Sequence, residues 1–280
     1  MRVVKSQLSH CLDLFEAMSD ASRDHRLTDL AARLKNPKSS VQRLLDHLAD
    51  EGWVDQDHAT GRYRLTLRLA LLGQRYMQTA GIAGATQGIL DRVARDAGEL
   101  VRLTVVDQAQ LVWIGAAQGA PAGLLYQPSM GGRIVSFATA NGKAWLATLS
   151  DEEACAIAIG DGLGRRPANG GPPANVGPKA IATIDALRAE LTTVRARGYA
   201  IADEEAEPGV AAIAVAIRDP ESGIALGTTS VAGPIVRLPP ERRPALAASL
   251  AGAAHELARI WPLGRPTPGR AGAQQMESRP

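Results

Sequence analysis

The sequence has few of the residues that mark specialised folds. Only two of its 280 residues are cysteines, Cys11 and Cys155, so we predict no disulfide framework and no metal site, and we expect a reducing compartment. No run reaches the roughly 18 consecutive apolar residues of a membrane helix. The first residues contain no apolar signal segment. We therefore expect a cytoplasmic protein with no membrane partner.

The sequence also lacks an excess of charge of either sign. The 31 Lys and Arg residues oppose 29 Asp and Glu residues, a formal net charge of +2, so any surface that binds nucleic acid must be local. Hydrophobic residues make up 45% of the chain, near the average of globular proteins, which excludes wholesale disorder. A chain of this length accommodates about two domains.

The first 65 residues predict three short helices followed by a hairpin. A second helix is expected near Leu27, with Thr28 as its N-cap, and a third at Pro37, with Asn36 as its cap. Residues 53–56 and 62–65 flank a Gly-containing turn and predict a two-stranded wing. In the first helix, residues at steps of three and four form the expected buried stripe: Leu8, Cys11, Leu12, Phe15 and Met18.

The third helix has an apolar side and a polar side. Apolar residues at positions 41, 44, 45 and 48 predict the buried side, and the opposite side carries side chains that suit base edges and phosphates. Helix-turn-helix proteins insert the N-terminal part of such a helix into the major groove of DNA. Acidic residues follow later in the helix and would repel phosphate, so we expect only its first two turns to enter the groove. The predicted DNA contacts are Lys38, Ser39, Ser40, Gln42 and Arg43 on this helix and Arg62 and Arg64 on the wing.

Residues 66–80 predict a helix that is apolar on more than one face. Such a helix is buried on several sides. The pattern is compatible with an internal core helix of one domain and with a helix that packs against a second subunit.

The remaining residues mix strands and helices and predict an α+β domain with an antiparallel sheet. The Gly- and Pro-rich residues 160–180 predict a surface loop, and no strand leads into their glycines as a dinucleotide site requires, so no cofactor is predicted. Residues 262–280 are expected to be disordered. The predicted strands are 100–106, 111–115, 124–127, 199–202, 211–218 and 225–231, and the predicted helices are 84–97, 139–147, 184–197 and 240–260.

Three strings together resemble the winged helix-turn-helix of the IclR family of bacterial transcription regulators. They are LTDLA at 27–31, PKSSVQRLL at 37–45 and GRYRL at 61–65. The resemblance covers roughly residues 6–261. It implies a winged helix-turn-helix domain at 1–65, a linker helix at 66–81 and a GAF-like or profilin-like effector domain at 82–261. It also implies a homodimer, with a tetramer left open, that presents two recognition helices to an inverted repeat of double-stranded operator DNA.

The string FATANGKA at 137–144 resembles the family's effector-pocket motif, His-Ala-Thr/Ser-x-x-Gly-Lys-Ala. A helix N-terminus exposes unpaired amides, so a carboxylate could be held near Ala140 and Asn141. The alternative is a capped helix with nothing bound. Lys143 either adds positive charge to the site or faces solvent.

Residues 197–214 resemble the family's second pocket segment, which implies that Asp203 binds or frames a ligand and that Ala212 lines the floor. Phe137 stands where the family usually has His, and Ala212 stands where many members have Cys, so we expect a more apolar pocket. Tyr126 and Ile134 complete the predicted site, with Met130 and Trp145 nearby. The predicted effector is a small acid with a hydrophobic or aromatic body.

These observations predict a ligand-responsive transcription factor. An enzyme is not predicted, because the acidic residues 203–205 have no adjacent nucleophile or base and the chain contains no HExxH or GxSxG string. The alternative is a sensor that binds a small molecule and dimerises through its helical head without binding a specific DNA sequence.

Overall fold

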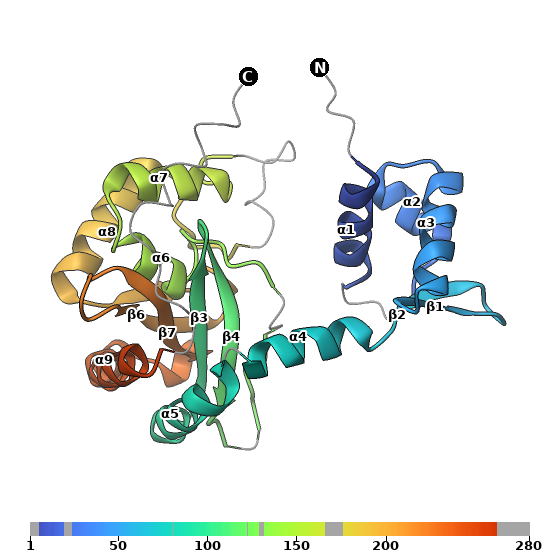
Figure 1. Cartoon of the computed structure of the whole chain (residues 1–280). Helices are drawn as coiled ribbons and strands as arrows, with labels where there is room; N and C mark the ends of the chain where they lie inside the picture. Colours follow the sequence, from blue (N-terminus) through green and yellow to red (C-terminus); the bar gives the residue numbers. More distant parts are fainter. Residues whose placement is uncertain are drawn as a thin grey trace. The chain divides into compact units, whose positions relative to one another are not determined.

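The computed structural model describes residues 6–19, 24–79, 81–121, 123–128, 132–165 and 176–261. The chain divides into two compact units, residues 1–79 and 80–280 (Figure 1). Among the helices of the described ranges, none is both long enough and apolar enough to cross a membrane.

The first unit is a three-helix head with a wing, as predicted. Its elements are α1 (Gln7–Met18), α2 (Leu27–Leu34), α3 (Lys38–Asp50), β1 (Val54–Asp57) and β2 (Arg62–Leu65). The two strands pair antiparallel, with Val54 opposite Leu65. The buried residues of α3 are the four predicted ones, Val41, Leu44, Leu45 and Leu48. They anchor α3 in the core of the head.

The prediction for α1 is wrong at two positions. Leu8 and Leu12 are 70% and 57% exposed, and the buried residues are Leu14, Ala17 and Met18. Because α1 packs on α2 and β2, the C-terminal half of the helix covers the small core while Leu8 and Leu12 remain outside it.

The predicted helix caps also shift by one or two residues. The N-cap of α2 is Arg26, so Thr28 lies inside the helix and donates a hydrogen bond to Asp29. The N-cap of α3 is Pro37 rather than Asn36. Such shifts are the usual uncertainty of helix ends.

Helix α4 (Arg68–Thr79) follows the wing. None of its residues is buried within the described part of the chain. Leu67, Leu71, Leu72 and Tyr76 are each more than half exposed. Within the first unit, α4 is therefore not an internal core helix.

The second unit is built on one five-stranded antiparallel sheet in the order β4-β3-β7-β6-β5, which confirms the predicted α+β class. Its strands are β3 (Leu100–Asp107), β4 (Gln110–Gln118), β5 (Ala200–Asp203), β6 (Val210–Arg218) and β7 (Ala225–Pro234). Its helices are α5 (Ile82–Ala97), α6 (Ala140–Leu146), α7 (Asp151–Gly160), α8 (Ile184–Arg197) and α9 (Arg243–Arg259), with 3-10 turns at Ile235–Arg237 and Pro240–Arg242.

Helices cover both faces of this sheet (Figure 1). Helices α5 and α9 pack on one face, against alternate side chains such as Val101, Leu103 and Ile213. Helix α6 packs on the other face, and α8 contacts α6 and α7 behind it. Because side chains alternate along a strand, Arg102 and Ala212 face α6.

One prediction about this unit is wrong, and one helix was not predicted. Residues 124–127 are not a strand, and α7 was not predicted, although Ser150 and Glu153 form a capping box at its start. Residues 166–175 of the Gly- and Pro-rich segment, the predicted disordered tail 262–280 and Met130 lie outside the described residues.

Candidate nucleic-acid interface and ligand cavity

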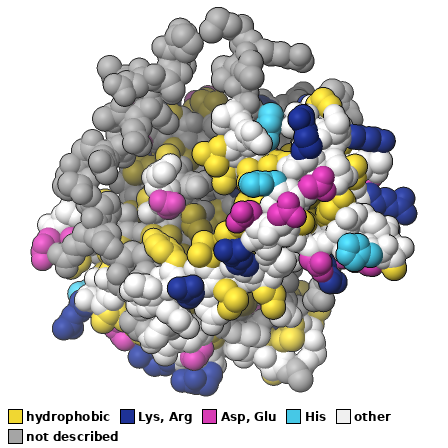
Figure 2. All heavy atoms as spheres, turned by 45° about the vertical axis from the view of Figure 1, so that its right-hand side comes forward, with side chains coloured by type: hydrophobic (Ala, Val, Ile, Leu, Met, Phe, Trp, Pro, Cys, Tyr) yellow, Lys and Arg dark blue, Asp and Glu magenta, His cyan; other side chains and the backbone are white. Residues whose placement is uncertain are grey.

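The first two turns of α3 present polar side chains to solvent. Lys38, Ser39, Ser40 and Arg43 are exposed, while Val41 on the opposite side is buried. The fixed apolar side determines which side chains point outward, because successive residues turn by about 100° around a helix. Figure 2 shows basic and acidic side chains interspersed over the face of the molecule that it draws, with no large patch of one sign.

Gln42 is half-buried and joins α3 to the wing. Its side-chain amide donates hydrogen bonds to Asp46 Oδ1 at 2.6 Å and to the hydroxyl of Tyr63 at 2.8 Å. A contact between this amide nitrogen and a base requires that at least one of these bonds be exchanged.

The two wing arginines have different surroundings. Arg64 lies opposite Asp55 across the hairpin and donates from Nε and Nη2 to Asp55 Oδ2 at 2.9 Å and 2.5 Å. These hydrogen bonds and the negative charge of Asp55 raise the pKa of Arg64. Arg62 makes no ion pair with any residue of the described ranges. Of the two, Arg62 is the more available for an external anion.

A small cavity of about 50 Å³ lies in the second unit, between the sheet and the start of α6. It is lined by four of the predicted effector residues, Tyr126, Ala140, Asn141 and Ala212. Additional lining residues are Arg102, Trp113, Thr139, Ala202, Ala206, Val210, Ser230 and Ala232.

Arg102 brings a positive charge to this cavity. The side chain is 6% exposed, and its Cζ lies 3.2 Å from the centroid of the Trp113 ring. Burial lowers the pKa of Arg102 to about 10, so the guanidinium is still charged at neutral pH. A buried cation beside a cavity favours an anionic ligand.

Tyr126 lies next to this charge. Its hydroxyl donates to Glu207 Oε1 at 3.1 Å. Burial and the negative charge of Glu207 raise the pKa of Tyr126, so its hydroxyl stays protonated and keeps donating to Glu207.

The start of α6 is held in place by side chains from the sheet and from its own cap. Thr139 Oγ1 accepts from Gly142 N at 3.1 Å, and Asn141 Nδ2 donates to Thr228 Oγ1 at 2.8 Å. A Cβ on Gly142 would lie 2.2 Å from Ser136 O, so this position requires glycine. The first turn of α6 is therefore fixed against the sheet at the cavity.

Two predicted effector residues do not line the cavity. Ile134 is buried in the core cluster that contains Phe137. Asp203 binds Arg243 of α9 through two hydrogen bonds of 2.9 Å and 2.8 Å, which pair its carboxylate within the fold.

Lys143 does not face solvent. It is 1% exposed, and its Nζ lies 2.7 Å from Glu205 Oε1 and 3.3 Å from Glu190 Oε1. Its charge is thus compensated inside the protein, away from the cavity lining.

The sequence interpretation missed Arg102, Trp113 and Ser230. A usable signal was present, because Arg102 is the one charged residue within the otherwise uncharged residues 100–106. Alternation along this predicted strand places Arg102 on the face opposite Val101 and Leu103.

Comparisons with known proteins cover most of the chain. The family model for the bacterial transcriptional regulator IclR C-terminal domain matches residues 74–259, and the IclR helix-turn-helix model matches residues 7–58. The HTH-type transcriptional regulator XynR of Escherichia coli is 27% identical over 224 residues, which cover 80% of this chain and 84% of XynR.

Two solved structures show the same fold. An IclR-type regulator of Alicyclobacillus acidocaldarius has a TM-score of 0.76 at 22% identity, covering 90% of this chain and 97% of its own. An IclR homolog of Microbacterium hydrocarbonoxydans, complexed with 4-hydroxybenzoate, has a TM-score of 0.70 at 21% identity, covering 91% of this chain and 98% of its own.

Proposed function

The chain belongs to the IclR family of bacterial transcriptional regulators, and on this premise we propose that it binds operator DNA with its first unit under the control of a small organic acid bound by its second. The observation that carries the proposal is that one chain joins an exposed basic helix start at Lys38 and Arg43 to a cavity with a buried cation, Arg102.

The proposed DNA contacts differ in how freely they can form. Lys38, Ser39, Ser40 and Arg43 on α3 are exposed, and their side chains make no hydrogen bond or ion pair with another described residue. Arginine at such a position can bind guanine through two hydrogen bonds. Arg62 is proposed as a phosphate contact, because it makes no ion pair among the described residues.

The remaining two proposed contact residues are Gln42 and Arg64. Each must break a bond within the head before it can bind DNA. Gln42 is bound to Tyr63, and Arg64 is bound to Asp55. Because each contact with DNA replaces one within the head, we propose smaller contributions from these two residues.

The proposed effector is an acid with a small apolar or aromatic body. Arg102 is positioned to bind the carboxylate, and charge-assisted hydrogen bonds of this kind contribute about 1.5–3 kcal/mol. Trp113 and Tyr126 offer aromatic surface. The 4-hydroxybenzoate complex of the Microbacterium relative supports this class of ligand.

The cavity volume of about 50 Å³ is far below the roughly 300–1,000 Å³ of a typical small-molecule site. We propose that the structure represents a closed state and that Tyr126 moves to admit the effector. Tyr126 is suited to this movement, because residues 123–128 contain no helix or strand and its hydroxyl makes a single hydrogen bond, to Glu207, among the described residues.

The exposed apolar side chains of α4 support a homodimer, with a tetramer left open. Leu71, Leu72 and Tyr76 leave an unpaired apolar face that a second copy would cover. Two copies related by twofold symmetry would bind an inverted repeat. An effector changes DNA affinity by its own preference for one of two states, typically about 1–3 kcal/mol.

The test uses the full-length protein and a pool of random DNA duplexes. We expect enrichment of an inverted repeat and a change in its affinity when small carboxylic acids are added. The Arg43→Ala protein is expected to lose about 1–3 kcal/mol of affinity and to discriminate less at one base pair of each half-site. If no duplex is enriched but small acids raise the melting temperature, the result would instead support the alternative function, a small-molecule sensor that does not bind a specific DNA sequence.

A further inference from the structure

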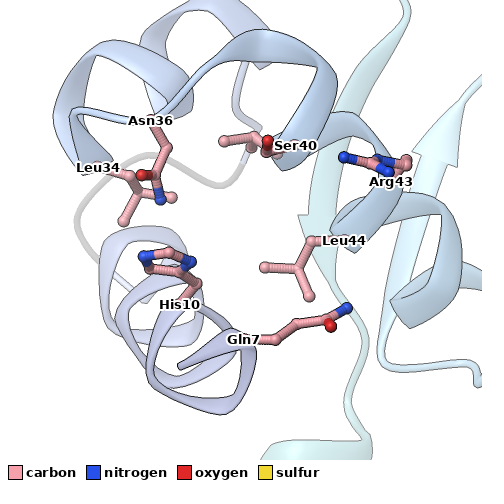
Figure 3. A pocket seen from close by; sticks show the side chains of 8 residues that line it. Gln7, His10, Leu34, Asn36, Ser40, Arg43 and Leu44 are labelled. Atoms are coloured by element: carbon pink, nitrogen blue, oxygen red, sulfur yellow. The ribbon is translucent and has the colours of Figure 1, made fainter. Parts of the chain in front are cut away.

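The head contains a second and larger cavity. It has a volume of about 360 Å³ and lies between α1, the turn from α2 to α3, and the first half of α3 (Figure 3). Its lining combines three apolar side chains, Leu34, Val41 and Leu44, with five polar ones. The polar residues are Gln7, His10, Asn36, Ser40 and Arg43.

These five polar side chains have no partner among the described residues. Within the described ranges of the head, none of them makes a hydrogen bond or ion pair. Gln42 on α3 and Arg64 on the wing, by contrast, are both bound to neighbours. Each of the five side chains is able to donate a hydrogen bond, and no carboxylate of a described residue lines the cavity. The lining therefore suits an anion with several acceptor oxygens.

The cavity lies on the flank of α3 that is opposite the wing. Gln42, which contacts Tyr63 of the wing, and Ser40, which lines the cavity, are separated by about 160° around the helix axis. A helix of about 10–12 Å diameter fills a major groove about 12 Å wide, so both phosphate walls come within reach of its flanks. In this geometry the wing lies toward the phosphate backbone on one side of the groove, and the cavity lies toward the phosphate backbone on the other side.

We propose that this cavity receives one sugar-phosphate unit of the operator backbone, so that Gln7 and His10 of α1 become part of the DNA-binding surface. Leu34, Val41 and Leu44 suit the deoxyribose, and the surrounding donors suit the phosphate oxygens. Arg43 lies at the edge of the cavity (Figure 3), so its positive charge attracts the phosphate from a distance, and the hydrogen bonds to the phosphate come from the other four polar side chains. The inference rests on the proposed function, since it needs DNA bound at α3.

The experiment measures duplex affinity at one fixed salt concentration for the full-length Gln7→Ala and His10→Ala proteins. Each variant is expected to bind every sequence about threefold to tenfold more weakly, with unchanged base preference, because a phosphate contact carries no sequence information. His10→Gln, which keeps a donor, is expected to recover most of the affinity. Gln110→Ala at the exposed start of β4 and His255→Ala on α9 serve as matched controls and are expected to bind as wild type.

Neutral methylphosphonates then locate the phosphate. They are placed one at a time along the enriched duplex, and the loss of affinity that each causes is measured. At one position per half-site, the loss measured with wild type is expected to disappear in His10→Ala. Wild-type affinity in both alanine variants, or unchanged penalties at every position, would overturn the inference while leaving the proposed function in place. Failure of wild type to bind any duplex would instead count against the proposed function.

The signals of the His10 ring in NMR spectra separate DNA from a free anion. We expect them to shift when the duplex is added and to remain unchanged with inorganic phosphate at the same ionic strength. A shift with inorganic phosphate and none with DNA would identify a site for a free anion and would contradict the inference.

Discussion

The guanidinium of Arg102 stacks on the indole ring of Trp113, with Cζ 3.2 Å from the ring centroid, at the edge of the sheet that β4 forms. The two residues come from the adjacent strands β3 and β4 and face the same side. The ring restricts the guanidinium to one orientation. A carboxylate that enters the cavity therefore meets a cation that loses little further freedom on binding.

Replacing this cation tests its role directly. Arg102→Gln is expected to weaken the binding of a stabilising carboxylic acid by about 1.5–3 kcal/mol, because one charge-assisted interaction is lost. The measurement is the ligand-dependent rise in melting temperature, titrated to give an affinity. Arg188→Gln, a change of an exposed arginine on α8, is the matched control and is expected to leave acid binding unchanged. Equal affinities of Arg102→Gln and wild type would rule out Arg102 as the anchor.

The pKa of Arg102 gives a pH dependence with a definite sign. Arg102 is protonated below its folded-state pKa of about 10 and loses its charge as the pH rises through that value. Acid affinity in wild type is expected to be constant between about pH 7 and 9 and to fall above about pH 10. Calorimetric titration should show this fall in wild type but not in Arg102→Gln. A parallel fall in both proteins would point to another titrating group.

The two wing arginines are expected to respond differently to substitution. Arg62→Ala should weaken binding to all duplexes evenly and reduce the slope of log affinity against log salt by about 1. Arg64→Ala should have a smaller effect on both quantities, because Asp55 already balances this charge. Anisotropy titrations at several salt concentrations measure both quantities. A larger effect for Arg64 than for Arg62 would show that its ion pair opens on DNA.

Gly142 is expected to tolerate no side chain. Gly142→Ala places a Cβ 2.2 Å from a backbone oxygen, so α6 must shift away from the sheet, at a cost of about 1–3 kcal/mol of unfolding free energy. Gly88→Ala, in α5 where a Cβ meets no atom within 4 Å, is the control and should stabilise the protein by about 0.5–1 kcal/mol. Urea unfolding compares them, and a neutral Gly142→Ala would show that the start of α6 adapts easily.

Local periodicity was sufficient to predict the elements that carry the DNA-binding proposal. The four apolar residues of α3 recur at helical spacing, and their burial fixes the outward row that contains Arg43. The prediction that Leu8 and Leu12 of α1 are buried was wrong. Helical spacing of apolar residues identifies an apolar surface, but it does not tell whether the same chain covers that surface.

The ligand cavity was harder to predict, because its walls come from separated segments. Asp203 was assigned to it from local similarity, but a partner 40 residues away, Arg243, pairs with its carboxylate. Arg102 was missed for the converse reason. Its neighbour Trp113 becomes adjacent only through the pairing of β3 with β4.

Five alanines line the ligand cavity, namely Ala140, Ala202, Ala206, Ala212 and Ala232. Each ends at a methyl group, so any one can be enlarged to Val or Ser by a single substitution that leaves Arg102 in place. Such changes would alter the shape of the acid that fits while retaining the charge that attracts it. Preferences for new ligands of the proposed cavity could therefore evolve in small steps without a new anchoring group having to arise.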